Sequence, residues 1–256
     1  MNSLETLFLA KDVRFFKELE STNSKLKQLL SEQTLAEGVL VYASYQTGGR
    51  GQRNSSWFSP PGENILMSLL LKPNFLEADM QFELNKIISL SIISLLEDLG
   101  LKEDIHIKWP NDVYVAGKKL SGILIECGLS GSKISEAVVG IGLNVNSESF
   151  PEDLSKACSL FTLLKNGEKL SVEELMFKLV KNIEQYYLLL RAKKNKGLHQ
   201  QYLSYLLGYR EEREFELYEE QIERGHIQGV DPQGRLIVKF GQRTMLFNNK
   251  EIKFIL

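Results

Sequence analysis

The sequence predicts an α+β protein in which a sheet packed with helices is followed by a small all-β module. In the first 207 residues, short apolar runs rich in β-branched residues are interrupted by longer runs with helical spacing. After residue 207, short strand-like runs separated by turn residues follow. Apolar residues make up 43% of the 256, which is enough for a sizeable core. We therefore expect two domains, residues 1–207 and residues 208–256.

The first predicted elements are a strand, a helix and two further strands. Residues 13–20 have the β-branched and aromatic content of a strand. The polar stretch 21–24 precedes residues 25–35, whose leucines recur at helical spacing. Such a stretch indicates an N-cap, and the free N–H groups of a helix terminus can also bind an anion or a polar ligand. Residues 38–45 and 64–71 follow as apolar strands.

The middle of the chain predicts a buried helix and a hairpin. Residues 82–99 carry apolar side chains on several faces, which indicates a helix buried against the sheet. Residues 105–108 and 113–115 resemble strands, and Pro110 interrupts them because proline lacks an amide hydrogen. A tight turn at residues 116–117 leads into a strand over residues 118–127. Residues 136–143 form another buried strand.

Helices and then short strands complete the chain. Residues 150–170 give a mixed signal, while residues 172–192 and 198–207 have helical spacing. Asp231, Pro232 and Gly234 occupy the first, second and fourth positions of a type I turn. The strands expected after residue 207 are 214–218, 221–230, 235–240, 244–248 and 251–256.

Composition and charge exclude several classes of protein. Lys and Arg number 31 against 33 Asp and Glu, so no global field favours nucleic acid. Cys127 and Cys158 lack metal-site spacing and are expected to be free thiols in a reducing compartment. The N-terminus has no signal-peptide pattern, and the longest uncharged apolar stretch, residues 87–96, is too short to span a bilayer. We expect a soluble cytoplasmic protein without membrane or nucleic-acid partners.

A glycine-rich loop between two predicted strands is the strongest candidate for a functional site. Residues 45–62 combine several glycines with Arg50, Arg53 and Trp57. Glycine lets the backbone approach a ligand, arginine grips phosphate or carboxylate, and an indole ring offers a flat face to a nucleobase. A surface loop with turn glycines is the equally weighted alternative from composition.

Three more polar segments stand at the edges of apolar strands or helices. They are residues 21–23, residues 108–112 together with Lys119, and residues 140–144. One such segment is weak evidence, and the sequence has no G-x-x-x-x-G-K-[ST] phosphate loop. Four of them in one small domain indicate a single shared cavity.

These segments resemble the motifs of the biotin protein ligases, the biotin–[acetyl-CoA-carboxylase] ligases. The matching stretches, in family order and spacing, are E-S-T-N (20–23), Y-Q-x-x-G-R-G (45–51), W-F-S-P (57–60), K-W-P-N-D-V-Y (108–114), K-L-S-G-I-L-I-E (119–126) and G-I-G-L-N-V-N (140–146). The stretch G-V-D-x-x-G-R-L (229–236) resembles the small C-terminal barrel of that family. The resemblance covers about residue 13 to the end, and K-W-P-N-D followed by K-L-x-G-I-L-x-E is highly specific.

The resemblance implies a fold and a reaction. The fold is a mixed sheet packed with helices, followed by a small SH3-like β-barrel. About a dozen residues precede the first matched strand, too few for the N-terminal DNA-binding domain of some members, so we expect the short form. ATP, with Mg²⁺ on its phosphates, would convert biotin to biotinyl-5′-AMP and pyrophosphate. A lysine of a biotin carboxyl carrier protein domain would then attack the mixed anhydride and release AMP.

Position by position, the resemblance also implies site residues. Biotin would contact Ser21, Thr22, Asn23, Gln46, Arg50, Gly51, Gln52, Lys119 and Gly122. ATP would contact Arg50, Arg53, Trp57, Asn111, Lys119, Gly142 and Asn144. The catalytic residues would be Lys119, Arg50 and Asp112, with Asp112 also the candidate partner of Mg²⁺ or of the incoming amine. Trp109 and Pro110 are expected to set shape, and Gly122 and Gly142 have close backbone packing as an alternative role.

Departures from the family pattern keep alternatives open. Gln52 stands where many members have a second arginine, and Ser55 stands near the place of another basic residue, so this loop carries fewer cations. A lipoate–protein ligase-type acyltransferase shares the fold, but its R-R-x-x-G-G-G stretch is absent here. A non-catalytic biotin sensor is the alternative from another class. The sequence does not decide whether the chain forms a homodimer, or what the β-module contacts.

Overall fold

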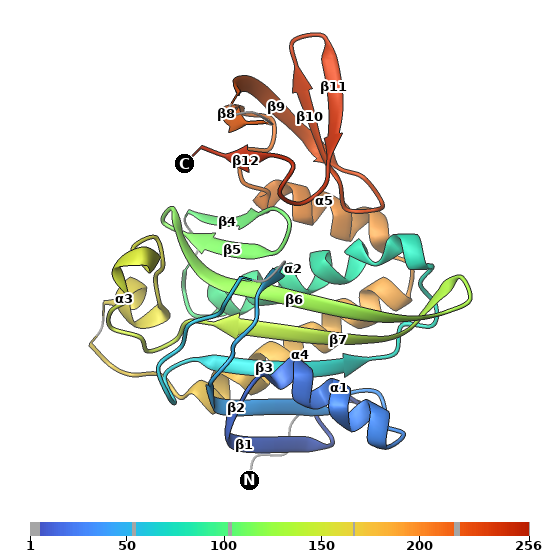
Figure 1. The fold of residues 1–256 in the computed structure, drawn as a ribbon, viewed down its shortest axis with the longest axis vertical. Coiled ribbons are helices and arrows are strands. Elements are labelled where there is room, and N and C mark those ends of the chain that lie inside the picture. Colours follow the sequence, from blue (N-terminus) through green and yellow to red (C-terminus); the bar gives the residue numbers. More distant parts are fainter. Residues whose placement is uncertain (1–5, 53–54, 102–103, 166, 218–220, 256) are drawn as a thin grey trace.

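A computed structural model describes residues 6–52, 55–101, 104–165, 167–217 and 221–255 of the chain. Arg53, one of the expected nucleotide ligands, lies outside these ranges. Within them, the chain forms a large seven-stranded sheet with helices on its faces and a five-stranded sheet at the C-terminal end (Figure 1).

The large sheet is mixed, with the strand order β1-β2-β3-β7-β6-β5-β4. The edge strand β1 runs parallel to β2, and the neighbours from β2 to β4 pair antiparallel. The prediction of a mixed sheet is therefore confirmed. The strands are β1 (Val13–Leu19), β2 (Leu40–Gln46), β3 (Ile65–Leu71), β4 (Ile105–Lys108), β5 (Asp112–Val115), β6 (Lys118–Ser130) and β7 (Lys133–Leu143).

Helices cover both faces of this sheet (Figure 1). Leu26 of the first helix packs with Val41 in a small core on one face. The adjacent Leu40 belongs to the main core on the other face, because successive residues of a strand point to opposite sides. The strongly apolar helix α2 (Phe82–Asp98) lies in that main core, as predicted. The helices are α1 (Thr22–Glu32), α2 (Phe82–Asp98), α3 (Leu160–Leu164), α4 (Val172–Arg191) and α5 (Asn195–Tyr205), with 3-10 turns η2 (Ala78–Met80) and η3 (Glu152–Leu154).

Two local features differ from the prediction. Helix α1 begins at Thr22 rather than at residue 25, because Ser21 has extended backbone angles and its hydroxyl caps the N–H of Ser24. Thr22 and Asn23 therefore lie in the first helical turn. Helix α3 occupies part of the segment with a mixed signal, and a capping box between Ser159 and Thr162 fixes its start.

The second sheet is antiparallel, with the order β11-β10-β9-β8-β12. Gly234 donates its N–H to the carbonyl of Asp231 at 3.0 Å, so the turn predicted there is present. Closure into an SH3-like barrel stays a prediction. The strands are β8 (Glu212–Glu216), β9 (Ile222–Val230), β10 (Leu236–Phe240), β11 (Arg243–Phe247) and β12 (Lys253–Phe254).

The two sheets share a continuous core. Trp109 donates its indole N–H to the carbonyl of Gly234 at 2.8 Å. Gly234 also lies against the ring of Phe82, where a Cβ would come within 2.5 Å of the ring. The β-module is therefore held on the large sheet beside the K-W-P-N-D segment, and the shape-setting role expected of Trp109 stays a prediction.

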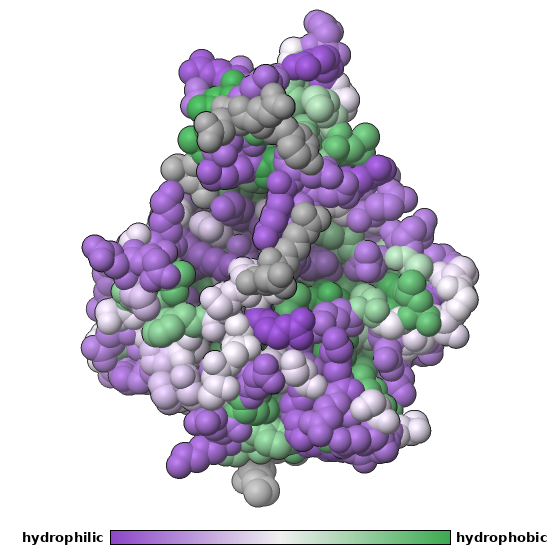
Figure 2. Space-filling view, in the orientation of Figure 1, coloured by the Kyte–Doolittle hydropathy of each residue, from purple (hydrophilic) through white to green (hydrophobic). Residues whose placement is uncertain are grey.

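The surface seen in Figure 2 is largely hydrophilic, and hydrophobic side chains form small separate patches on it. Among the helices in the described ranges, none combines the length and apolarity needed to cross a membrane.

Candidate functional site

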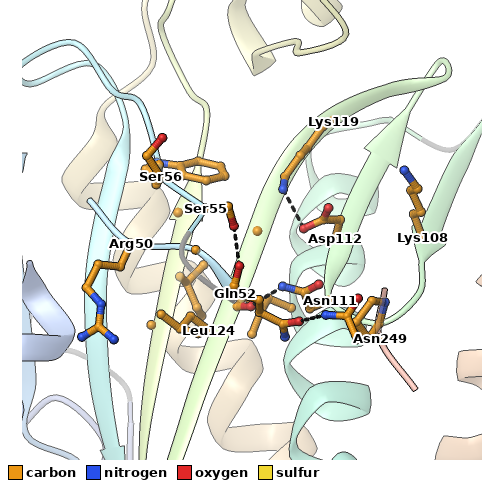
Figure 3. A pocket seen from close by; sticks show the side chains of 18 of the residues that line it. Arg50, Gln52, Ser55, Ser56, Lys108, Asn111, Asp112, Lys119, Leu124 and Asn249 are labelled. Atoms are coloured by element: carbon orange, nitrogen blue, oxygen red, sulfur yellow. Dashed lines mark hydrogen bonds and ion pairs between the residues drawn. The ribbon is translucent and has the colours of Figure 1, made fainter. Parts of the chain in front are cut away.

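A cavity of about 420 Å³ lies where the large sheet, the N-terminus of α1 and the C-terminal module meet. It brings together most of the residues that the sequence predicted (Figure 3). The predicted residues that line it are Ser21, Thr22, Asn23, Gln46, Arg50, Gly51, Gln52, Trp57, Asn111, Asp112, Lys119, Gly122 and Gly142.

One end of the cavity is a buried network of hydroxyl and amide groups. Ser68 Oγ donates to Asn23 Oδ1 at 2.6 Å and lies 2.7 Å from Thr22 Oγ1. The backbone N–H of Thr22 donates to Gln46 Oε1 at 2.7 Å. Asn23 fits here because Gly140 opposite it has no side chain; a Cβ there would overlap the amide. These groups suit a small polar ligand head that offers both donors and an acceptor.

Sequence reasoning missed Ser68. It is fully buried in β3, a strand that is otherwise apolar along its whole length. A single hydroxyl in a buried strand needs a hydrogen-bond partner, so its position in I-L-M-S-L-L-L was a usable signal.

The floor of the cavity is formed by two glycines under the ring of Trp57. A Cβ on Gly142 would overlap this ring, and one on Gly122 would lie 3.0 Å from it. Both glycines thus pack closely against an indole ring rather than against backbone, and their contact with a ligand stays a prediction. The Nε1 of Trp57 is buried and finds no acceptor among the described residues, which leaves a donor inside the site.

The other end of the cavity carries charge. Lys119 Nζ lies 2.8 Å from Asp112 Oδ1 (Figure 3). Lys108, beside this pair, lies 3.4 Å from the Tyr114 hydroxyl and 5.2 Å from the centre of its ring. The pKa of Lys108 is below its ordinary value, chiefly because the side chain is buried. The Asp112 carboxylate raises this pKa, whereas the nearby cations of Lys119 and Lys156 lower it. Burial also raises the pKa of Tyr114 to about 12.

Asn111 holds the K-W-P-N-D segment onto β6. Its Nδ2 donates to the carbonyl of Ile123 at 2.6 Å, and the carbonyl of Asn111 accepts the N–H of Ile123 at 3.0 Å. The side chain lines the cavity with its amide nitrogen already engaged.

Arg50 lies on the opposite side of the cavity from Lys119 (Figure 3). Its guanidinium is 3.6 Å from Glu126 Oε1 and 3.4 Å from Ser24 Oγ. Gly51 donates its N–H to the carbonyl of Ser55 at 2.6 Å, which folds the loop back on itself. The two predicted cations are thus in one site but do not converge on one point.

The C-terminal module supplies one wall of the cavity, which sequence reasoning did not predict. The side chain of Asn249 hydrogen-bonds to Gln52 in the glycine-rich loop. No motif marks these positions, since a tertiary contact between the two sheets brings them to the site. The residues of the module that line the cavity are Asn249, Lys250, Ile252, Lys253 and Phe254.

Asn144 is the predicted residue that the structure does not bring to the cavity lining. It is buried, and its Nδ2 donates to the carbonyl of Cys158 at 3.0 Å. It therefore fastens the end of β7 to the segment before α3. The G-I-G-L-N motif runs on past the site into a structural contact, so its last residue could not be assigned from spacing.

The described residues contain no group of three or more His, Cys, Asp or Glu side chains placed to hold a metal ion. Among the described residues that line the cavity, Asp112 is the one with a carboxylate side chain. A single carboxylate fits an ion such as Mg²⁺, which keeps several waters and takes other ligands from substrate phosphates.

The fold and the cavity together suit a protein of the class that takes a small polar ligand beside a lysine–aspartate pair. Residues 15–144 match the Biotin/lipoate A/B protein ligase family, and the chain belongs to that family. The resemblance stated from the motifs is thereby confirmed.

Individual relatives support the same family. The bifunctional ligase/repressor BirA of Bacillus spizizenii is 33% identical over 158 residues, which are 60% of this chain and 47% of BirA. The biotin–[acetyl-CoA-carboxylase] ligase of Paracoccus denitrificans is 34% identical over 49% of this chain and 51% of its own. The matched regions thus span about half the length of these curated relatives.

The solved structure of the biotin protein ligase from Aquifex aeolicus in complex with biotin and ATP is similar along nearly the whole chain. The TM-score is 0.78 with 28% sequence identity, and the match covers 96% of this chain and 99% of that one. The similarity includes the C-terminal module, beyond the part of the chain that the family match covers.

Proposed function

We propose that this protein is an ATP-dependent biotin–protein ligase that forms biotinyl-5′-AMP and transfers biotin to a lysine of a biotin carboxyl carrier protein domain. The observation that carries the proposal is the cavity, which has the Lys119–Asp112 pair at one end and Thr22 and Asn23, hydrogen-bonded to the buried Ser68, at the other. The similarity to a ligase solved with biotin and ATP supports it.

The polar end of the cavity suits the biotin head. A ureido group has two N–H donors and one carbonyl acceptor. Ser21, Thr22, Asn23 and Gln46 provide hydroxyl and amide groups around that end. A buried site built to pair with such a group discriminates against a ligand that lacks it, because its own polar groups would then be left unpaired. This favours biotin over lipoate.

Adenylation needs cations where two anions meet. A carboxylate oxygen of biotin attacks the α-phosphorus of ATP, a new O–P bond forms, and pyrophosphate leaves. Lys119 lines the cavity and would leave Asp112 to contact the carboxylate of biotin and the α-phosphate of ATP. Arg50 would swing from Glu126 toward the same phosphate. Mg²⁺ would enter on the ATP phosphates, with Asp112 as its protein ligand, and would screen their charge.

Transfer needs a neutral amine. A lysine amine has a pKa of about 10.4, so it arrives protonated at neutral pH. Once Lys119 contacts the adenylate, the Asp112 carboxylate is free to orient the amine and take its proton. The amine nitrogen then attacks the biotinyl carbonyl and AMP leaves.

The nucleotide has a candidate place beside Trp57. Its ring lies over Gly142 and Gly122, and its indole N–H finds no acceptor in the part of the chain that the structure describes. We assign Trp57, Asn111 and Gly142 to the nucleotide, with the C-terminal Asn249 close to the same loop. The adenine would stack on the indole or displace it.

The direct test is mass spectrometry of a carrier-domain fragment after incubation with the full chain, biotin and MgATP. We expect one added biotin on one lysine, and none with lipoate or without ATP. Modification by lipoate would instead favour the lipoate-type acyltransferase. Biotin binding without any transfer would favour the sensor. A gel-shift assay checks the expectation of no DNA binding, and sedimentation decides whether the chain forms a homodimer.

A further inference from the structure

Glu126, the last residue of the K-L-S-G-I-L-I-E motif, contacts two predicted site residues, Asn23 and Arg50. Its Oε2 accepts a hydrogen bond from Asn23 Nδ2 at 2.9 Å. Its Oε1 accepts one from Lys27 Nζ at 2.9 Å and lies 3.6 Å from the guanidinium of Arg50. The residue itself stands behind Asn23, outside the lining of the cavity.

The first contact fixes the orientation of the Asn23 amide. A carboxylate only accepts hydrogen bonds, so the nitrogen of the amide must face it. Asn23 Nδ2 also reaches the carbonyl of Leu124 at 3.3 Å, which is a second acceptor on the same side. The amide oxygen is thereby turned to the Ser68 hydroxyl. A reversed amide would turn its oxygen toward the Glu126 carboxylate and the Leu124 carbonyl, which only accept hydrogen bonds, and would deprive both of their donor.

The second contact holds Arg50 loosely. The separation of 3.6 Å is too long for a charge-assisted hydrogen bond, and the arginine side chain is 46% exposed. A phosphate offers the guanidinium two short hydrogen bonds and so competes well with this contact.

Because Lys27 also binds Glu126, the release of Arg50 costs little free energy. Lys27 shares Glu126 Oε1 with Arg50 and is the closer of the two cations. When Arg50 departs, the carboxylate keeps its partner in Lys27 and its hydrogen bond from Asn23. Burial raises the pKa of Glu126, but the hydrogen bonds from Lys27 and Asn23 outweigh this and leave the pKa below its ordinary value. The carboxylate is therefore charged in both arrangements.

We propose that Glu126 is a positioning residue that orients the Asn23 amide for the head of the acyl substrate and holds Arg50 aside until a nucleotide phosphate takes its guanidinium. The proposal rests on the proposed function for the identity of the two ligands. It assigns one carboxylate to two separable tasks, which two substitutions distinguish.

The test measures KM for biotin and for ATP by pyrophosphate release, with the full chain carrying Glu126→Gln or Glu126→Ala. Glutamine keeps an oxygen for Asn23 but loses the charge that holds Arg50. We expect an ATP KM about two- to fivefold lower and an unchanged biotin KM, as the loss of one exposed ion pair implies. Glu126→Ala is expected to lower the ATP KM in the same way. It is also expected to raise the biotin KM about tenfold, because the Asn23 amide loses its charged partner.

Two further variants sharpen the test. Lys27→Gln leaves Arg50 as the remaining cation on Glu126 and is expected to raise the ATP KM. In an Arg50→Ala background, Glu126→Gln is expected to leave the ATP KM unchanged. Glu223→Gln breaks an exposed pair with Arg243 in the C-terminal module and serves as the matched control without effect. Equal changes in both KM values for the Gln and Ala variants, or an ATP effect that persists without Arg50, would overturn the proposal.

Failure of the proposed function is separable from failure of this inference. If the unmodified chain forms no adenylate from biotin and ATP, the function fails. Calorimetric titration with ATP alone then tests Glu126. Tighter binding by Glu126→Gln that disappears in the Arg50→Ala background would support the positioning role, and equal affinity of all variants would refute it.

Discussion

Lys119 and Asp112 form an ion pair of 2.8 Å across the hairpin of β5 and β6. A bulge in this hairpin shifts the register, so that Asp112 faces Gly122 rather than Ser121. The ion pair therefore stands beside a position without a side chain, where the Trp57 ring comes close. The Lys119–Asp112 pair and the Trp57 ring therefore both depend on Gly122.

Lys119→Ala is expected to abolish adenylate formation, with a loss of about a hundred- to a thousandfold or more, because a fixed cation at the developing charge is removed. The assay is pyrophosphate release with biotin and MgATP. The folded state should survive, since the lysine side chain is 34% exposed. Lys118→Ala, at the exposed neighbouring position, is the matched control and should keep full activity. Normal adenylation by Lys119→Ala would contradict the assignment.

Asp112→Asn is expected to slow the second step by about a hundredfold or more, as the loss of a general base implies. The measurement uses preformed biotinyl-5′-AMP and a carrier-domain fragment, so that adenylation does not enter the rate. An asparagine keeps the size of the side chain but cannot take a proton from the amine. Full transfer rates with this variant would remove the base role.

Gly142→Ala is expected to displace the Trp57 ring, because a Cβ at this position would overlap the indole. The expected result is an altered Trp fluorescence spectrum together with a raised KM for ATP. Gly197→Ala is the control, since a Cβ there meets nothing within 4 Å. An unchanged spectrum and an unchanged KM would show that the ring does not depend on this glycine.

Glu184→Ala is expected to lower the free energy of unfolding by about 2–5 kcal/mol, measured by chemical denaturation. The buried carboxylate of Glu184 in α4 accepts the backbone N–H groups of Leu7, Phe8 and Leu9 at 2.6–2.9 Å. Its removal leaves these donors without an acceptor. Glu223→Gln, in an exposed ion pair, should cost less than about 1 kcal/mol. Equal effects of the two changes would show that the N-terminal segment does not depend on Glu184.

Stability is expected to fall at alkaline pH through Tyr187. Burial raises the pKa of its hydroxyl, and the hydrogen bond to Glu37 at 2.7 Å raises it further. The folded state therefore binds this proton more tightly than the unfolded state, whose tyrosine pKa is about 10. The contribution of Tyr187 to the free energy of unfolding is fully present below pH 10 or so and is lost as the pH rises above about 10. Thermal unfolding from pH 8 to 11 should show a shallower loss for Tyr187→Phe, and identical slopes would contradict the assignment.

The sequence by itself determined much of the fold and most of the site. Apolar periodicity located the strands and long helices of the large sheet, since burial on one or both faces leaves a regular pattern. The motifs named thirteen of the residues that line the cavity, because these residues stand at positions that match the motifs of the family. They also identified the family.

The tertiary structure alone decided how those residues meet. Asn144 hydrogen-bonds to Cys158 instead of lining the cavity. Two residues from segments without a motif take part: Asn249 lines the cavity, and Ser68 hydrogen-bonds to Asn23 behind it. The bulge that selects Gly122 and the carboxylate of Glu126 that reaches both Asn23 and Arg50 depend on register and on contacts between distant segments. Local patterns record which side chains are buried, but not which partners from elsewhere in the chain bury them.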